Sequence, residues 1–148
     1  MAFLSSMSVV GSGLTAQKLR LDVISENITN ISTTRTEGGG PYRRKLTVLE
    51  AIEPASAFEK ALEKAGNGRA EQAGGVRVTE IREDPSDFRL LYDPTHPDAD
   101  EEGYVRLPNV DPIKEMTDAM AVNQAYSANV TAFNVLKQVA ARGLEIGK

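Results

Sequence analysis

The chain has 148 residues, of which 41% are apolar and 5% aromatic, with a net charge of −4 and no cysteine. This length suits one compact domain, or a small domain with extended appendages. The missing cysteines exclude disulfides, thiolate catalysis and cysteine-ligated zinc, and the acidic balance argues against binding to nucleic acid or to an anionic membrane.

Residues 1–17 lack both the basic segment and the cleavage site of a secretory signal. No apolar run in the chain approaches the roughly 18 residues of a membrane-spanning helix, so we expect no direct membrane insertion. The protein is therefore expected to be cytoplasmic, or to be exported by a route that needs no cleaved signal.

The first segment, up to Ile31, predicts a long amphipathic helix. Its large apolar residues recur at alternating steps of three and four, which is the spacing of a coiled-coil seam. Two glycines and several serines lower its helix propensity, so we expect this helix to need a partner. The residues that we expect on its assembly face are Met7, Val10, Leu14, Leu21, Ile24, Ile28 and Ile31.

The middle of the chain, residues 35–110, predicts a small β-rich domain that carries all of the net charge. A polar turn and the run Gly38-Gly39-Gly40-Pro41 separate it from the first helix. Strands are expected over residues 44–53, 76–83, 88–92 and 103–107. A short helix over 55–64 and a flexible glycine-rich loop near 54–75 are expected between the first two strands.

The last segment, residues 111–148, predicts a second long helix. Asp111-Pro112 supplies a helix-capping side chain followed by proline at the first helical position. Small alanines along it permit close approach of another helix. The residues that we expect on its assembly face are Met116, Met120, Tyr126, Val130, Phe133 and Leu144.

Two arrangements of these terminal helices, 1–34 and 111–148, are open. They could pack on each other or on the middle domain within one chain, or they could pack against neighbouring copies in an assembly. Their seam-like patterning, similar lengths and neutral charge favour assembly. The expected fold is thus α+β, with two long coiled-coil-like terminal helices flanking a small β-rich middle.

Candidate sites for chemistry are weak. Residues 98–103, DADEEG, resemble the start of a calcium loop, but the twelfth position is Asn109 instead of a bidentate glutamate. The lone His96 lies in a proline-flanked turn, and the triple glycine lacks the following lysine of a phosphate loop. We therefore expect no catalytic, cofactor or metal site.

Residues 21–42, LDVISENITNISTTRTEGGGPY, resemble the N-terminal motif of the flagellar rod and hook family. That motif is a helix followed by a threonine-rich turn and a basic strand. Residues 37–41 depart from the shorter turn of the family. Residues 92–109 resemble its proximal-rod members, and residues 125–130 and 144–147 resemble its closing helix. The matching residues of the N-terminal motif are Leu21, Asp22, Ile24, Asn27, Ile28, Asn30, Thr33 and Thr34.

The resemblance implies a structural subunit of the bacterial flagellar rod that polymerises through its terminal helices into the axial drive shaft. It implies the periplasmic rod as the location, reached through the flagellar type III apparatus with an uncleaved N-terminal signal. The implied partners are further copies of the chain, the rod proteins FlgB, FlgF and FlgG, the adaptor FliE and the membrane ring. A cytoplasmic coiled-coil binding module, such as an export chaperone, and a calcium-dependent enzyme or adhesion domain are the alternatives.

Overall fold

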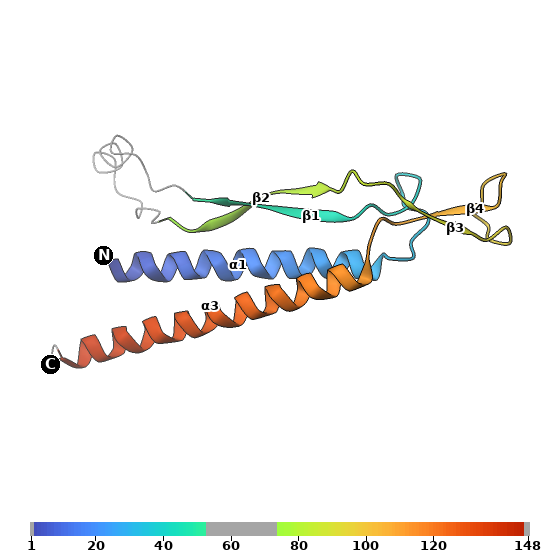
Figure 1. Ribbon diagram of the computed structural model, residues 1–148. Coiled ribbons are helices and arrows are strands. Elements are labelled where there is room, and N and C mark those ends of the chain that lie inside the picture. Colours follow the sequence, from blue (N-terminus) through green and yellow to red (C-terminus); the bar gives the residue numbers. More distant parts are fainter. Residues whose placement is uncertain (1, 53–73, 147–148) are drawn as a thin grey trace, which may run out of the picture. The chain divides into compact units, whose positions relative to one another are not determined.

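The computed structural model describes residues 2–52 and 74–146 (Figure 1). Two long helices flank a middle region of four strands, which confirms the predicted α+β class. The elements are α1 (Ala2–Thr29), β1 (Lys45–Ala51), β2 (Val76–Glu83), β3 (Arg89–Tyr92), β4 (Tyr104–Leu107) and α3 (Pro112–Ile146). All four predicted strands are present, with ends within two residues of the expected ones. The predicted short helix over 55–64 lies outside the described residues, as does most of the loop near 54–75.

Local hydrogen bonds set the helix ends where the sequence predicts them. Asp111 accepts a hydrogen bond from the backbone N–H of Ile113 at 2.9 Å, which caps the start of α3. Past the end of α1, the Thr33 backbone N–H donates to the Asn30 carbonyl at 3.1 Å and turns the chain. No helix among the described residues is long and apolar enough to cross a membrane.

The strands form two separate two-stranded sheets, β1–β2 and β3–β4. In the second sheet, β3 runs antiparallel to β4 with Leu90 opposite Arg106 and Tyr92 opposite Tyr104. Sheets of two strands are marginal in water. Each therefore depends on packing against other elements or against other chains.

The described residues divide into two compact units. The first draws on residues 2–19, 49–52, 74–79 and 123–146, and the second on residues 20–48 and 80–122. Both helices and the strands β1 and β2 contribute to both units. The predicted roles of residues 1–34, 35–110 and 111–148 as two assembly helices around a β-rich domain are not decided by this packing and stay a prediction.

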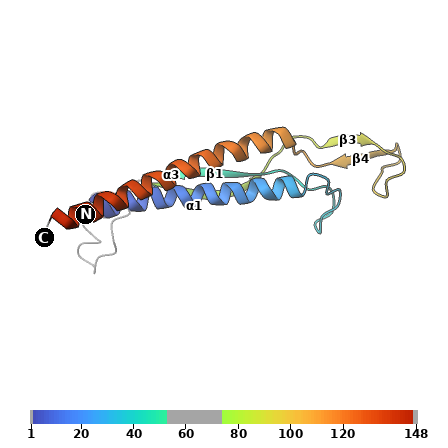
Figure 2. The ribbon, with the colours of Figure 1, turned by 90° about the horizontal axis from the view of Figure 1, so that it is seen from below.

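In the first unit, α1 lies close to α3. A Cβ added at Gly13 would come 3.0 Å from Asn129 Nδ2 of α3, so glycine permits this close approach. In the second unit, the last turns of α1 lie beside the first turns of α3 (Figures 1 and 2). There the buried apolar side chains are Val23, Ile24, Tyr42, Val105, Val110 and Val122. Packing within one chain, one of the two arrangements left open, thus occurs in both units.

The β3–β4 hairpin depends on Gly103, whose φ of 83° is disfavoured for other residues. An added Cβ would also come 3.1 Å from Tyr92 Cε2 and 3.2 Å from Pro94 Cβ. We predict that Gly103→Ala lowers the free energy of unfolding by about 1–3 kcal/mol, measured by urea denaturation. The control is Gly38→Ala, because a Cβ at Gly38 would meet no atom within 4 Å. Equal stability of the two variants would contradict the prediction.

Candidate functional site

Asn27, near the end of α1, lies at the centre of a buried polar network in the second unit. Its side chain is 1% exposed. Its Nδ2 donates to the Lys45 carbonyl at 2.9 Å and to Glu115 Oε2 at 3.0 Å. Its Oδ1 accepts hydrogen bonds from the Tyr42 hydroxyl and from the Lys45 backbone N–H, both at 2.9 Å. All four hydrogen-bonding positions of this amide are therefore filled.

Glu115, on the first turn of α3, is fully buried at 0% exposure. Its Oε1 accepts a hydrogen bond of 2.5 Å from Arg44 Nε, which forms a buried ion pair. The same guanidinium reaches Asp84 at 3.4 Å and Asp118 at 3.3 Å. A buried carboxylate is costly unless it is paired and hydrogen-bonded. These hydrogen bonds therefore fix the side chains of Asn27, Arg44 and Glu115 relative to one another.

The network shifts the ionisation of its members. Burial and the nearby carboxylates of Glu26 and Glu115 raise the pKa of Tyr42 from 10.0 to about 12. Burial alone would lower the pKa of Arg44, but hydrogen bonding to Glu115 and the charge of that carboxylate give a net upward shift. Tyr42 is thus neutral and Arg44 charged over the whole physiological range.

The Asn109 side chain joins the loop before β3 to the polar network around Arg44. The Asn109 side chain accepts a hydrogen bond from the Arg44 backbone N–H at 2.8 Å and donates to Ser86 Oγ at 2.8 Å. Hydrogen bonds from Ser86 lower the pKa of Asp84, with a smaller contribution from Arg44. Asp84 therefore remains ionised beside Arg44 at neutral pH.

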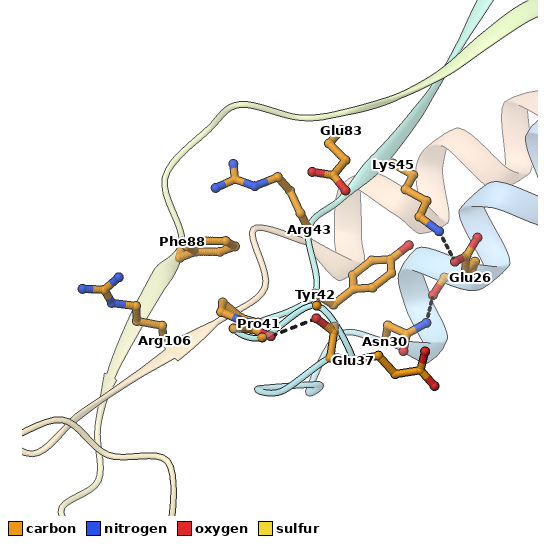
Figure 3. A pocket seen from close by; sticks show the side chains of 14 residues that line it. Glu26, Asn30, Glu37, Pro41, Tyr42, Arg43, Lys45, Glu83, Phe88 and Arg106 are labelled. Atoms are coloured by element: carbon orange, nitrogen blue, oxygen red, sulfur yellow. Dashed lines mark hydrogen bonds and ion pairs between the residues drawn. The ribbon is translucent and has the colours of Figure 1, made fainter.

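A cavity of about 730 Å³ lies beside this network (Figure 3). On one side, the Lys45 ammonium pairs with Glu26 and lies 5.7 Å from the centre of the Tyr42 ring. On another side, the Arg43 guanidinium lies 4.3 Å from the centre of the Phe88 ring. Charged side chains of both signs line the cavity, so it has no preference for a ligand of one charge. They are Arg43, Lys45, Arg106, Glu26, Glu37 and Glu83.

The buried polar side chains of the described residues are paired within the chain. Every buried side-chain nitrogen or oxygen among them has a hydrogen-bond partner, and they include no group of three His, Asp or Glu side chains placed to hold a metal. In the acidic segment of residues 98–103, Asp98 accepts a hydrogen bond from Thr34, and Asp100 accepts from the backbone N–H groups of Glu102 and Tyr104. Asp98 thus links this loop to the turn after α1, and Asp100 holds the conformation of the loop itself.

The residues predicted on the assembly face differ in exposure. Ile24 is buried in the second unit. The half-buried ones are Met7, Val10, Leu14, Leu21, Ile31, Val130 and Phe133. The exposed ones are Ile28, Met116, Met120, Tyr126 and Leu144. Their role in contacts between chains stays a prediction.

The network itself was not among the residues singled out from the sequence. The sequence marks Asn27 only as part of a motif, and no apolar pattern in it indicates Glu115 or Arg44 as core residues. A signal existed, because Glu115 lies seven residues before the buried Val122 and so on the same face of α3. Apolar spacing alone does not detect a charged residue on such a face.

Comparison with known proteins gives matches at both ends of the chain and along its whole length. A family model described as flagella basal body rod protein matches residues 7–35, and one described as flagellar basal body rod FlgEFG protein C-terminal matches residues 101–146. The flagellar basal-body rod protein FlgC of Bacillus subtilis (strain 168) is 46% identical over 97% of both chains. The FlgC proteins of Borreliella burgdorferi and Escherichia coli O6:H1 are 43% and 35% identical, over 98% or more of each chain.

The buried ion pair predicts a large effect on stability. Glu115→Leu leaves the Arg44 charge without its closest partner and Asn27 Nδ2 with one acceptor fewer. We predict a loss of about 3–5 kcal/mol in the free energy of unfolding, and a smaller loss for Glu115→Leu combined with Arg44→Met. The control is Glu80→Leu, which breaks the exposed pair with Arg82 and should cost less than about 1 kcal/mol. A Glu115→Leu protein as stable as the control would contradict this account.

The raised pKa of Tyr42 predicts that the protein loses stability at alkaline pH. Because its folded-state pKa is raised above the unfolded value, its stabilising contribution is complete below pH 10 and is lost as pH rises through about 12. The free energy of unfolding should fall by about 2–3 kcal/mol from this group across that range. Tyr42→Phe should lack this component in urea titrations at each pH. Parallel pH profiles for the two proteins would refute the assignment.

Proposed function

Because the chain belongs to the FlgC family of flagellar basal-body rod proteins, we propose that it is a structural subunit of the basal-body rod that assembles through its terminal helices into the axial drive shaft. The observation that carries this proposal is the 46% identity to a FlgC protein over 97% of the chain. The two family models, at residues 7–35 and 101–146, fall mainly on the two helices.

The surfaces of the helices support assembly through them. Residues 1–17 and 119–136 contain no charged side chain. Exposed helix faces in soluble proteins normally carry charged and polar residues. On α3, however, the exposed side chains include Met116, Met120, Val135 and Val139. Exposed apolar surface of this kind marks a protein interaction site.

The first turns of α3 provide the sharpest part of this surface. Ile113, Met116 and Met120 follow one another at steps of three and four and so share one face. They are 76%, 62% and 74% exposed, whereas Glu115 and Val122 on the other face are buried. Met116 and Met120 therefore contact neighbouring subunits, and Ile24, which the fold already buries, stabilises the subunit instead.

The finer parts of the proposal rest on the family resemblance. The subunit is exported unfolded through the flagellar type III apparatus, without a cleaved signal, into the periplasmic rod. Its neighbours are further copies of the chain, FlgB, FlgF, FlgG, FliE and the membrane ring. Its role is mechanical and uses no catalytic residue or cofactor. Recovery from cytosol but not from purified basal bodies would support the competing coiled-coil module or export chaperone.

A paired substitution on α3 tests the assembly face. Met116→Asp with Met120→Asp should leave the melting temperature of the purified subunit within a few degrees, because exposed positions contribute little to folding. The same variant should not enter basal bodies, since each carboxylate would be desolvated in the contact. The control is Met116→Leu with Met120→Leu, which keeps the apolar surface and should restore motility. Normal rods built from the Asp variant would disprove the proposal that this face of α3 mediates assembly.

A further inference from the structure

The β3 strand presents an unusual edge. Its apolar side chains are solvent-exposed: Leu90 by 64%, Leu91 by 50% and Tyr92 by 64%. Among the described residues, β3 pairs only with β4, and in Figures 1 and 2 no other strand runs beside it. Unpaired edge strands are templates for pairing with another chain unless charge, proline or a covering segment blocks them.

The register shows which backbone groups the open edge offers. The Asp93 N–H donates to the Gly103 carbonyl at 3.0 Å, so this is a hydrogen-bonded pair of the ladder. Because hydrogen-bonded and non-hydrogen-bonded pairs alternate in antiparallel sheets, Tyr92 and Leu90 occupy non-hydrogen-bonded pairs. Their N–H and C=O groups therefore point away from β4, toward the open edge.

The corresponding edge of β4 is partly closed by its own loop. The Tyr104 N–H donates to Asp100 Oδ1 at 2.8 Å, and the Tyr104 carbonyl accepts from the Asp100 N–H at 2.9 Å. No such loop covers Leu90 or Tyr92 in the part of the chain that the structure describes. The open edge of the hairpin is thus on β3.

Charges flank this edge with opposite sign. Arg89 is exposed at the start of β3, and none of the ion pairs between described residues involves it. Asp93, directly after β3, accepts two hydrogen bonds from Thr95 through Oδ1, and its Oδ2 stays available in the same described region. The strand therefore has a cation at one end and an anion at the other.

We propose that two copies of the chain pair along this edge, with the two β3 strands antiparallel and Leu91 opposite Leu91 on the two-fold axis. Leu90 of each copy then lies opposite Tyr92 of the other, and these outward-pointing residues exchange four backbone hydrogen bonds. Arg89 of each copy lies opposite Asp93 of the other, so two ion pairs flank the contact.

The neighbouring two-fold registers fit less well. With Tyr92 opposite itself, Leu90 would face Pro94, which has no N–H to donate. With Leu90 opposite itself, Arg89 would face Leu91 and its charge would have no partner. Opposite charges directly across a sheet are favourable. The register centred on Leu91 is the one that uses both the backbone groups and the charges.

This contact goes beyond the proposed rod function. A two-fold contact is complete at two copies and does not extend into a polymer. It covers the β3 edge in the subunit that has not entered the rod, where an open edge would otherwise pair indiscriminately. It does not involve the exposed methionines of α3.

A single cysteine tests the register. Leu91 on the axis would occupy a non-hydrogen-bonded pair, where side chains lie closest across the sheet, within reach of a disulfide. Since the chain has no cysteine, Leu91→Cys gives one defined cross-link with oxidised glutathione. We expect a disulfide-linked dimer from Leu91→Cys and none from Glu102→Cys at the hairpin tip, because the two tips point in opposite directions. No cross-link at position 91, or equal cross-linking at both positions, would overturn the proposal.

Charge exchange provides a second test that does not depend on one variant folding well. Arg89→Asp and Asp93→Arg should each weaken self-association about tenfold in sedimentation equilibrium, since each places two like-charged pairs across the sheet. An equimolar mixture of the two variants should dimerise again, because both pairs become attractive. Met116→Asp with Met120→Asp should leave this dimer intact. A failure of the rod proposal can therefore be distinguished from a failure of the dimer proposal. Unchanged association of the single variants, or no recovery in the mixture, would contradict the pairing.

Discussion

The buried ion pair between Glu115 and Arg44 is the constraint on which the second unit depends. Glu115 is fully buried and Arg44 nearly so, and a carboxylate in this environment requires both its charged partner and its hydrogen bonds. Asn27 supplies one of those bonds and fills its remaining positions with Tyr42 and the backbone of Lys45. One polar network thus joins the end of α1, the start of β1 and the start of α3.

The same network determines which face of α3 is available to other molecules. With Glu115 turned inward, the side chains of Ile113, Met116 and Met120 must point to solvent, because they lie on the other side of the helix. Exposed methionines suit repeated packing, since their flexible side chains adapt to irregular surfaces. The interaction that stabilises the subunit therefore also orients the surface through which we propose that the rod assembles.

The elements were predictable from the sequence because capping residues, turn residues and apolar spacing act locally. Asp111-Pro112 begins α3, and all four strands fall where β-type residues are bounded by turns. The roles of the apolar residues were less predictable. The apolar spacing predicts both Ile24 and Met116 on an assembly face. In the structure, however, Ile24 is buried within the chain and Met116 is exposed. Gly13 looked only unfavourable for a helix, whereas its missing Cβ allows α1 to approach Asn129. The network was missed because polar core residues leave no apolar pattern.

Oxidative footprinting of the methionines, read by mass spectrometry, tests the central claim most directly, because oxidation of methionine depends on its exposure. Met116 and Met120 are 62% and 74% exposed in the free subunit. Both should be oxidised rapidly in the purified protein and become protected in intact basal bodies. Equal oxidation rates at Met116 and Met120 in the free subunit and in basal bodies would contradict assembly through this face of α3.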